Sequence, residues 1–440
     1  MLAPRGLDGL ATQFDDDHAV AYAGLIQPAM LAEHLGLREL FDEYVRLGSR
    51  PGHAHVGHKA MTLIHSALAG GECIDDADAL RAGRTAAVLG HELRAPSTLG
   101  TFLRSFTWGH VRQLDRVAGE LLARAWRSGA GPGGEALTID VDSTICETYG
   151  LAKQGGKFGY KGVRGYHPLL ATVAGSGEVV HSRLRGGNAF SGRGAASFIA
   201  ESFRRVRSAG ATGPLTFRAD SGFYSRAVVA ACRRAKVRYS ITVRLQPGLR
   251  QAIEAIPEEN WTAIPYWQEG GADVAEIAYV PFGQKQAVRL IVRRVRPTPG
   301  TQLALLTNYS YHAFITDREG ELLELEADHR RHAQVENVIR DLKYGMGLNH
   351  LPSGRFGANG AWLVVNVIAH NLARWIARIG LGPETPLTTR TLRRRLLCLP
   401  GRLTRSARRW TLHLPRDWPW ADAFLAILER LRALPQPLPT

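Results

Sequence analysis

The chain has 440 residues, of which 45% are hydrophobic and 22% charged, the composition of a folded soluble protein with two to four domains or subdomains. Its formal net charge of +15, carried mainly by arginine, points to a polyanionic partner such as nucleic acid. GC-rich coding, which raises arginine, alanine and glycine together, is the alternative explanation. Four scattered cysteines exclude a disulfide framework and a zinc ribbon. The N-terminus lacks a signal-peptide pattern and the most apolar stretch, 361–379, is interrupted by polar residues, so we expect a cytoplasmic, nucleoid-associated protein without a membrane span.

Residues 1–130 are expected to form a helical DNA-binding domain. Apolar residues recur with helical spacing in 26–44 and 57–69, and further helices are predicted over 75–89 and 97–106. The last two, with Pro96 in the loop between them, resemble a helix-turn-helix, although an ordinary helical bundle has the same spacing. The segment SGAGPGG at 128–134 is predicted to be the linker or tight loop that ends this domain.

From residue 136 the periodicity becomes that of a mixed α/β domain. The predicted strands cover 136–141, 167–174, 178–184, 214–219 and 237–243, and the predicted helices cover 195–208 and 225–236. The order β-β-β-α-β-α-β is typical of a ribonuclease-H-like catalytic core, in which a mixed sheet carries helices on its faces. We assign 136–244 to the first part of this core.

Residues 245–320 interrupt that pattern. Prolines separate short strand-like runs there, which predicts a β-rich insertion. A long helix over 321–345 and a buried helix over 361–379 restore the helical period, so 321–380 is assigned to the rest of the catalytic domain. The remaining residues, 381–440, are predicted to form a basic C-terminal helical region, in which the arginines between 393 and 409 contact DNA phosphate.

Two aspartates end strands that lie side by side in such a core. Asp142 follows the first strand and Asp220 follows the fourth, so their carboxylates should meet at one edge of the sheet. Asp140 shares a face with Asp142, as residues two apart on a strand do, and competes with it for the first catalytic position. We prefer Asp142 because it lies at the strand end, and Asp140 is then expected to support it. Phosphodiester cleavage uses two divalent ions about 3.5–4 Å apart, and Mg²⁺ prefers carboxylate oxygens. Taken singly, each aspartate is also well explained as a strand-end cap or turn former.

A third carboxylate, Glu336, lies on a predicted basic helix. At helical spacing it shares one broad face with four cationic or titratable residues: His329, His332, Arg340 and Lys343. An acid in that setting can hold a metal while its neighbours bind phosphate. The alternative is a solvated ion pair with Arg340, worth only about 0.3–0.5 kcal/mol.

Together these segments resemble the DDE transposases of bacterial insertion sequences, in the cut-and-paste group with a tyrosine-arginine-glutamate-lysine signature. In that signature two residues separate Y from R, three separate R from E, and six separate E from K. Glu336 and Lys343 match the last two places, whereas His329 and His332 occupy the first two. The segment from Asp142 to Thr144 resembles the first aspartate motif of the group, and the segment from Arg218 to Tyr224 resembles the second. The resemblance covers roughly 136–380, with the β-rich insertion where this group has one.

The resemblance implies a metal-binding and catalytic triad of Asp142, Asp220 and Glu336 that holds two Mg²⁺ ions, with Mn²⁺ able to substitute. It implies cleavage by water at the ends of the element, which frees a 3′-hydroxyl, and attack of that hydroxyl on target DNA. The partners implied are double-stranded DNA, as inverted-repeat ends and as target, and a second copy of the chain in a homodimer on DNA. In this group the tyrosine and arginine places contact backbone phosphate, and histidine there carries only partial charge near its usual pKa.

Further DNA contacts are expected outside the triad. They are Arg330 beside the signature histidines, the basic loop residues Lys157, Lys161 and Arg164, and the aromatic pair Tyr266 and Trp267. In the group that the chain resembles, an aromatic residue of the insertion packs a flipped base, and the alternative for Tyr266 and Trp267 is ordinary packing. The spacing HxHxxH at His53, His55 and His58 permits a metal site, but without a supporting acid it fits a loop or helix start better.

Two other functions fit the same residues. One is a nuclease with the same metal chemistry that cuts DNA without joining it. The other is a catalytically inactive DNA-binding protein derived from a transposase. The presence of all three carboxylates favours an active enzyme over the inactive one.

Overall fold

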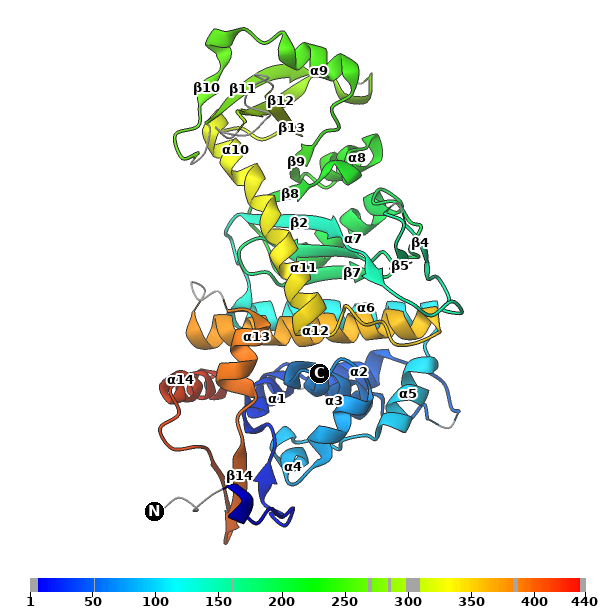
Figure 1. Cartoon of the computed structure of the whole chain (residues 1–440), viewed down its shortest axis with the longest axis vertical. Helices are drawn as coiled ribbons and strands as arrows, with labels where there is room; N and C mark the ends of the chain where they lie inside the picture. The colour runs from blue at the N-terminus through cyan, green and yellow to red at the C-terminus, as the bar shows by residue number, and fades with distance from the viewer. Residues whose placement is uncertain are drawn as a thin grey trace.

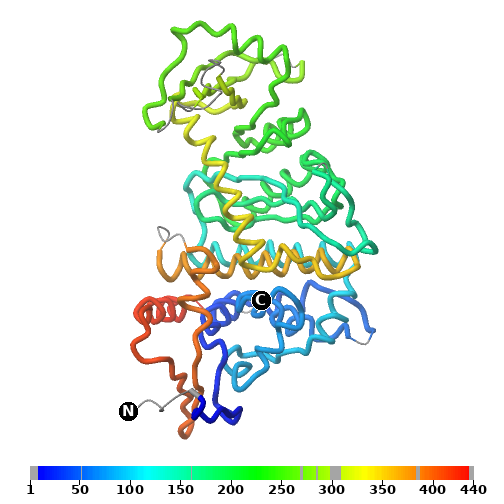
Figure 2. The backbone as a smooth tube through the Cα atoms, viewed as in Figure 1, coloured from blue at the N-terminus to red at the C-terminus, as the bar shows by residue number. Residues whose placement is uncertain are grey.

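The computed structural model describes residues 7–50, 52–159, 161–267, 271–283, 286–297, 309–382 and 387–435. The chain is elongated, and its helical N-terminal part, its central sheet and its insertion follow one another along the long axis (Figure 1). The long helix α12 (Phe356–Leu381) crosses between the N-terminal helices and the sheet, as the backbone trace also shows (Figure 2). One continuous apolar core includes residues of the N-terminal helices, α12 and the sheet.

A mixed sheet of nine strands forms the centre of the molecule, in the spatial order β10-β11-β12-β13-β9-β8-β2-β6-β7. Strands β2, β8 and β9 are parallel to one another, β6 runs antiparallel to β2, and β7 runs antiparallel to β6. Their bounds match the strands expected from the alternation: β2 (Leu137–Ser143), β6 (Leu169–Val173), β7 (Val179–Arg183), β8 (Leu215–Ala219) and β9 (Arg238–Thr242). Helices α7 (Ala195–Ser208) and α8 (Arg226–Arg234) connect β7 to β8 and β8 to β9.

The insertion adds strands to the same sheet. A short helix α9 (Pro247–Glu254) precedes four antiparallel strands, and the last of them pairs with β9. These strands are β10 (Thr262–Ala263), β11 (Ala272–Tyr279), β12 (Val288–Val295) and β13 (Ser310–Thr316). Strand-like runs are predicted within 245–320, and the structure has these strands there. A small three-stranded sheet of β3 (Cys146–Glu147), β4 (Lys157–Phe158) and β5 (Arg164–Tyr166) follows β2.

The N-terminal part is helical, with α1 (Ile26–His34), α2 (Leu37–Tyr44), α3 (Val56–Ala69), α4 (Thr85–Leu89), α5 (Pro96–Arg104) and α6 (Trp108–Ala125). The prediction of one helix over 75–89 is wrong, because a 3₁₀ segment, η3 (Asp75–Arg81), is separated from α4 by Gly83. Gly83 has φ 56°, and a Cβ there would meet the carbonyl oxygen of Ala19. A regular helix cannot continue through that conformation.

The long helix expected over 321–345 consists of two helices with a tighter turn between them. They are α10 (Leu322–Arg330) and α11 (Gln334–Gly345), joined by the 3₁₀ turn η9 (Arg331–Ala333). The C-terminal region, expected to be helical, also contains a β-hairpin. The hairpin strands are β14 (Gly401–Ser406) and β15 (Arg409–His413), and the helices of this region include α13 (Thr389–Leu392) and α14 (Ala421–Arg432). Within the described residues, no helix combines the length and apolarity that crossing a membrane requires.

A buried glutamate ties the sheet to two helices that pack against it and against each other. Glu178, which precedes β7 and is 2% exposed, accepts hydrogen bonds from the indole N–H of Trp126 (3.1 Å) and of Trp375 (2.5 Å). Trp126 follows α6 and Trp375 belongs to α12. Burial raises the pKa of Glu178 to about 7, despite the two indole donors, because the charged form loses its hydration.

This raised pKa makes stability depend on pH. The folded state binds the Glu178 proton more tightly than the unfolded chain, whose pKa is 4.5, so its contribution falls as pH rises from about 4.5 to about 7. At 1.36 kcal/mol per pKa unit the loss is roughly 3 kcal/mol. We expect urea unfolding curves of Glu178→Gln to lack this component. The quantity to compare is the slope of the free energy of unfolding against pH, because glutamine also alters one indole hydrogen bond and so changes the free energy itself. If Glu178→Gln has the same slope as wild type, another group causes the pH dependence.

Candidate active site

The two strand-end aspartates lie at the same edge of the sheet. Strands β2 and β8 pair in parallel with Val141 opposite Ala219, so Asp142 and Asp220 each follow the same register pair. Each aspartate also binds the local backbone, because Asp142 Oδ1 accepts from Ser143 N (2.6 Å) and Asp220 Oδ1 accepts from Gly222 N (3.0 Å). The turn-forming role and the catalytic role are therefore compatible, since the local hydrogen bond fixes each carboxylate and leaves its second oxygen for a ligand.

Electrostatics brings Glu336 into the same group. Burial, together with the negative charges of Asp220 and Glu336, raises the pKa of Asp142 to about 6, against the lowering effects of Ser143 N–H and His332. Both distant carboxylates thus act on the ionisation of Asp142, although ligand atoms of the three do not all lie within 4.8 Å of one another. Glu336 is exposed in the first turn of α11, and Asp220 is exposed after β8, so the cluster is open to solvent. Three mutually repelling carboxylates at an open sheet edge are a donor set that suits hard divalent cations.

A buried ion-pair network lies beside this cluster. Arg218 and Asp140, each 1% exposed, form a bidentate pair with Nε–Oδ1 and Nη2–Oδ2 distances of 2.8 Å. Arg218 also donates to Asp328 at the end of α10, and Asp328 pairs with Arg318. Burial acts to raise the pKa of Asp140, but hydrogen bonds from Arg218 and His332 lower it below its usual value. Asp140 is thus held as a charged supporting residue next to Asp142.

The two histidines of the signature have different environments. His332, in η9, places Nδ1 2.9 Å from Asp140 Oδ1, and its charge acts on Asp142. The ring of His329 stacks on Phe314 at 3.9 Å, while its nitrogens engage the hydroxyls of Ser240 (2.7 Å) and Thr242 (3.0 Å). Burial and neighbouring cations hold the pKa of His329 well below its usual value. Since both nitrogens are occupied and the ring is neutral, this geometry does not support the expected phosphate contact of His329.

A polar cleft of about 430 Å³ lies beside the segment that follows β2, and its described lining contains none of the three carboxylates. It begins at Ser143, the residue after Asp142, and Lys161 and Lys343 lie in its wall. Lys343 Nζ donates to Ile145 O at 2.6 Å, which ties α11 to the segment that follows β2. The structure therefore brings together two of the predicted DNA contacts, Lys161 and Lys343, at the mouth of the site.

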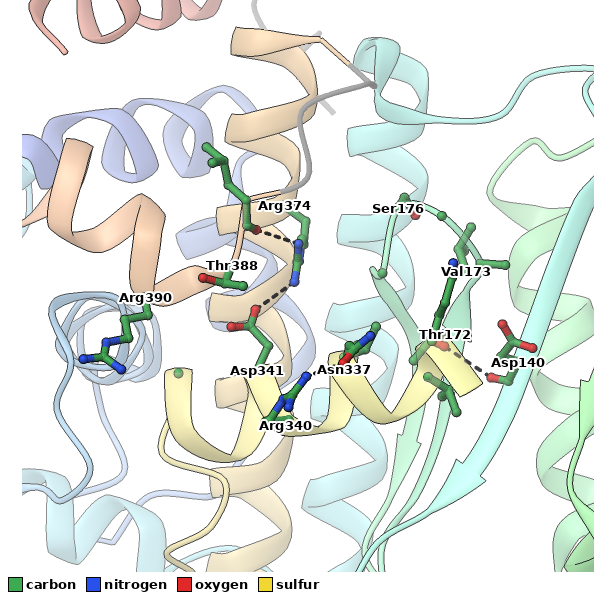
Figure 3. Close-up of a pocket in the computed structure, with 18 of the residues that line it drawn as sticks. Asp140, Thr172, Val173, Ser176, Asn337, Arg340, Asp341, Arg374, Thr388 and Arg390 are labelled. Atoms are coloured by element: carbon green, nitrogen blue, oxygen red, sulfur yellow. Dashed lines mark hydrogen bonds and ion pairs between the residues drawn. The ribbon is translucent and has the colours of Figure 1, made fainter. Parts of the chain in front are cut away.

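A second cleft, of about 760 Å³, lies along another face of α11. Arg340, Arg374 and Arg390 surround it, and Asp341 pairs with Arg374 at 2.7 Å (Figure 3). Its described lining includes Asp140 but none of the three carboxylates, and Asn337 and Asp341 project from α11 in other directions than Glu336. Arg340, four residues after Glu336 in the same helix, lines this cleft and donates to Asn337.

The remaining predicted contacts are scattered. Lys157 is exposed in β4, whereas Arg164 donates to the carbonyls of Gly150 and Leu151 and so braces its own loop. Tyr266 and Trp267 both lie under the guanidinium of Arg330, with centroid distances of 5.0 and 5.2 Å.

Contacts of the aromatic pair favour packing over base stacking for Trp267, whereas 41% of the surface of Tyr266 is exposed. Tyr266 donates to Glu326 at 2.9 Å, and Trp267 packs against a small apolar core of the insertion. Arg330 Nε lies 3.7 Å from Glu326. These contacts join the insertion to α10.

One further group has metal-ligand chemistry. Atoms of Asp115, His181 and Glu201 lie within 4.8 Å of one another. Arginine guanidiniums already neutralise both carboxylates: Arg205 and Arg112 lie 2.8 and 3.4 Å from Asp115, and Arg183 and Arg112 lie 2.8 and 3.0 Å from Glu201. Several fixed cations disfavour a metal ion there, so we interpret the group as a structural ion-pair network that joins α6, β7 and α7. Its sequence signal was a histidine within the apolar strand β7.

Comparison with known proteins places the chain in a family. No curated protein sequence matches it. A solved structure of the piggyBac transposase, in a synaptic complex with hairpin DNA, is similar at 11% identity and a TM-score of 0.44, over 86% of this chain and 79% of that one. The family described as transposase DDE domain group 1 matches residues 8–436. Because that match spans nearly the whole chain, the protein belongs to the DDE transposase domain family, group 1.

Proposed function

We propose that the protein is the transposase of an insertion sequence, which cuts DNA at the inverted-repeat ends of its element and joins the freed ends to target DNA. The observation that best supports the proposal is the pairing of β2 with β8, which puts Asp142 and Asp220 after the same register pair, together with the charge of Glu336, which acts on the ionisation of Asp142. The basic charge of the chain supports a DNA substrate.

The spatial order of β7, β6, β2, β8 and β9, with three parallel central strands, supports a ribonuclease-H-like core. We propose that 1–130 form a DNA-binding part, that 136–244 and 321–380 form this core around the 245–320 insertion, and that 381–440 form a C-terminal part. Glu336 and Lys343 support membership of the Y-R-E-K group, with histidines in its first two places.

In the proposed site, Asp142, Asp220 and Glu336 hold two Mg²⁺ ions, or Mn²⁺ in their place. Such ions, when bound, lower the pKa of a water and stabilise charge on the attacking and leaving oxygens. Asp140 and Arg218 fix the strand that carries Asp142. His332 lies between Asp140 and the cluster, where it orients a phosphate or the helix that bears Glu336. Lys161 and Lys343 attract the DNA backbone at the adjoining cleft, with Lys157 and Arg340 as further contacts.

Base stacking by the insertion is proposed for Tyr266 alone, since 41% of its surface is exposed whereas Trp267 is packed. We further propose a homodimer on DNA, because inverted ends are related by a two-fold axis that a symmetric dimer matches.

The test uses the purified full-length protein and duplexes that carry the DNA flanking its coding region. With Mg²⁺ or Mn²⁺ we expect nicks at the ends, and strand-transfer products when a target plasmid is added. EDTA should abolish both. Cleavage without any joined product would favour the nuclease alternative, and tight binding without cleavage in either metal would favour the inactive DNA-binding protein.

A further inference from the structure

The hairpin of β14 and β15, together with its turn, carries an unusual concentration of positive charge. Residues 401–416 contain no aspartate or glutamate and include the arginines Arg402, Arg405, Arg408, Arg409 and Arg416. The hairpin pairs with β1 (Ala19–Val20) in a three-stranded sheet at the end of the molecule opposite the insertion (Figure 1). We call residues 401–413 the basic ribbon.

The basic ribbon has one apolar face and one polar face. Leu403 pairs with Leu412, and both pack against a small core that contains Val20 and Ala23. Because side chains alternate along a strand, the intervening residues form the opposite face. In cross-strand pairs these are Arg402 with His413, Thr404 with Thr411, and Ser406 with Arg409. All of them are exposed except Thr404, which is half-buried. That face therefore presents mainly cations and short hydrogen-bonding groups to solvent, and Arg402 at its far end is paired with Asp16 at 3.4 Å.

Beside the turn, on the face of Leu403 and Leu412, Arg405 is partly preorganised to meet a phosphate at the edge of a DNA groove. Trp410, with 48% of its surface exposed, lies between the guanidiniums of Arg84 (5.5 Å) and Arg405 (5.4 Å). Arg405 also donates from Nε to Ala407 O at 3.1 Å, across the turn that Arg408 completes. Stacking on an aromatic ring and a backbone acceptor restrain the side chain before any partner binds. A restrained guanidinium loses less entropy when it meets a phosphate.

Other arginines of the same tail have internal roles. Arg393 donates to the carbonyls of Leu68 (2.8 Å) and Ala67 (2.9 Å), and joins the tail to α3. Arg395 stacks on Trp420 at 5.2 Å. The basic tail that the sequence predicted to contact DNA thus divides into an internal part and the exposed basic ribbon.

We propose that the basic ribbon binds duplex DNA, with its polar face and turn in the major groove, as a contact separate from the carboxylate site. The inference rests on the proposed DNA substrate of this protein. A two-stranded ribbon fits the major groove, which is about 12 Å wide, and arginine, serine and threonine donate to its phosphates and base edges. Pairing of β15 with β15 of a second copy is disfavoured, because it would bring like charges together along an arginine-bearing edge.

The test compares three full-length proteins: wild type, Arg405→Ala/Arg408→Ala/Arg409→Ala, and a control that removes the same charge elsewhere. The control, Arg127→Ala/Arg204→Ala/Arg234→Ala, changes exposed arginines of η4 (Trp126–Ala130), α7 and α8. Binding is measured by fluorescence anisotropy on a duplex of the flanking DNA across a salt series. We expect the ribbon variant to bind roughly 10- to 100-fold more weakly, with a salt slope lower by about 3. The control should stay near wild type.

Equal affinities of the ribbon and control variants would overturn the proposal, while normal cleavage by wild type would leave the proposed function intact. Wild-type protein that neither binds nor cuts the duplex would overturn both. A ribbon variant that changes the oligomeric state in light scattering, with unchanged DNA affinity, would assign the surface to a second copy instead. A variant with the single change Arg408→Ala, in the turn, tests the same surface in case the triple variant does not fold. It should lower the salt slope by about 1.

Discussion

Asp220→Asn is expected to lower the rate of DNA cleavage by on the order of 10³-fold, while DNA binding and thermal stability remain close to wild type. Removing one metal-binding carboxylate forfeits several kcal/mol of charge stabilisation in the transition state, at 1.36 kcal/mol per factor of ten. The fold should tolerate the change, because asparagine can still accept the hydrogen bond that Gly222 N donates to residue 220. The measurement is single-turnover nicking of end-containing duplex with saturating Mg²⁺.

The matched control is Asp422→Asn, an exposed aspartate in the first turn of α14. It should cut at the wild-type rate. Asp142→Asn and Glu336→Gln should reproduce the loss, and all three should weaken Mn²⁺ binding, which paramagnetic resonance reports without any reaction. Wild-type cleavage by any of the three would remove that residue from the proposed site. Loss of cleavage with unchanged Mn²⁺ binding would assign the residue another role.

The second large effect concerns the buried pair beside the site. Arg218→Met leaves Asp140 charged and 1% exposed without its bidentate partner, and should lower the free energy of unfolding by about 3–5 kcal/mol. Exchanging both members, Asp140→Leu with Arg218→Met, should recover most of that loss, because no buried charge is left unpaired. Urea unfolding of the single and double variants measures both quantities.

An exposed pair on the neighbouring strand gives the comparison. Arg238 of β9 pairs with Glu319 at 3.1 Å, with 53% and 92% of the two side chains exposed, so Arg238→Ala should cost only about 0.2–1 kcal/mol. A loss below about 1 kcal/mol for Arg218→Met would mean that solvent or His332 already compensates Asp140. In that case the pair would not be what holds β2 and β8 in register.

Acid should reveal the same pair. The pKa of Asp140 is lower in the folded protein than in the unfolded chain, so its stabilisation is complete above the unfolded pKa of 3.8 and is lost as pH falls through the folded value. This is opposite in sign to Glu178, whose contribution falls as pH rises towards 7. The contribution of Asp140 is therefore complete above pH 3.8, and that of Glu178 is complete only below about pH 4.5, so the two together stabilise the fold most between these two pH values.

Much of the central sheet could be predicted from the sequence. The helix over 195–208 has the predicted bounds, and β2, β6, β7, β8 and β9 agree with the predicted strands to within a few residues. Period-two alternation and helical spacing are properties of short segments, so they predict an element without knowledge of the residues that pack against it. Errors occurred where geometry depended on neighbours: Gly83 ends η3 against Ala19, and η9 interrupts the helix that contains the signature.

The network around Asp140 had a signal that sequence reading left unused. Asp140 and Arg218 are opposite charges within apolar strands, and each lies two residues before a candidate catalytic aspartate. In a parallel pair with Asp142 beside Asp220, they necessarily share a register position, as the structure has them. The partners Asp328 and Arg318 had no such signal, because they come from the far side of the insertion.

The sequence by itself determined the charge of the protein, its strand and helix periods and the three carboxylates, since these follow from residue identity and short-range spacing. Tertiary structure alone decided which charged groups meet. It buried His329 between hydroxyls and Phe314, turned Arg340 into a separate cleft, and split the basic tail into Arg393, which joins it to α3, and an exposed ribbon. Long-range packing sets burial and orientation, and an ionisable side chain acquires its role only from the partners that packing supplies.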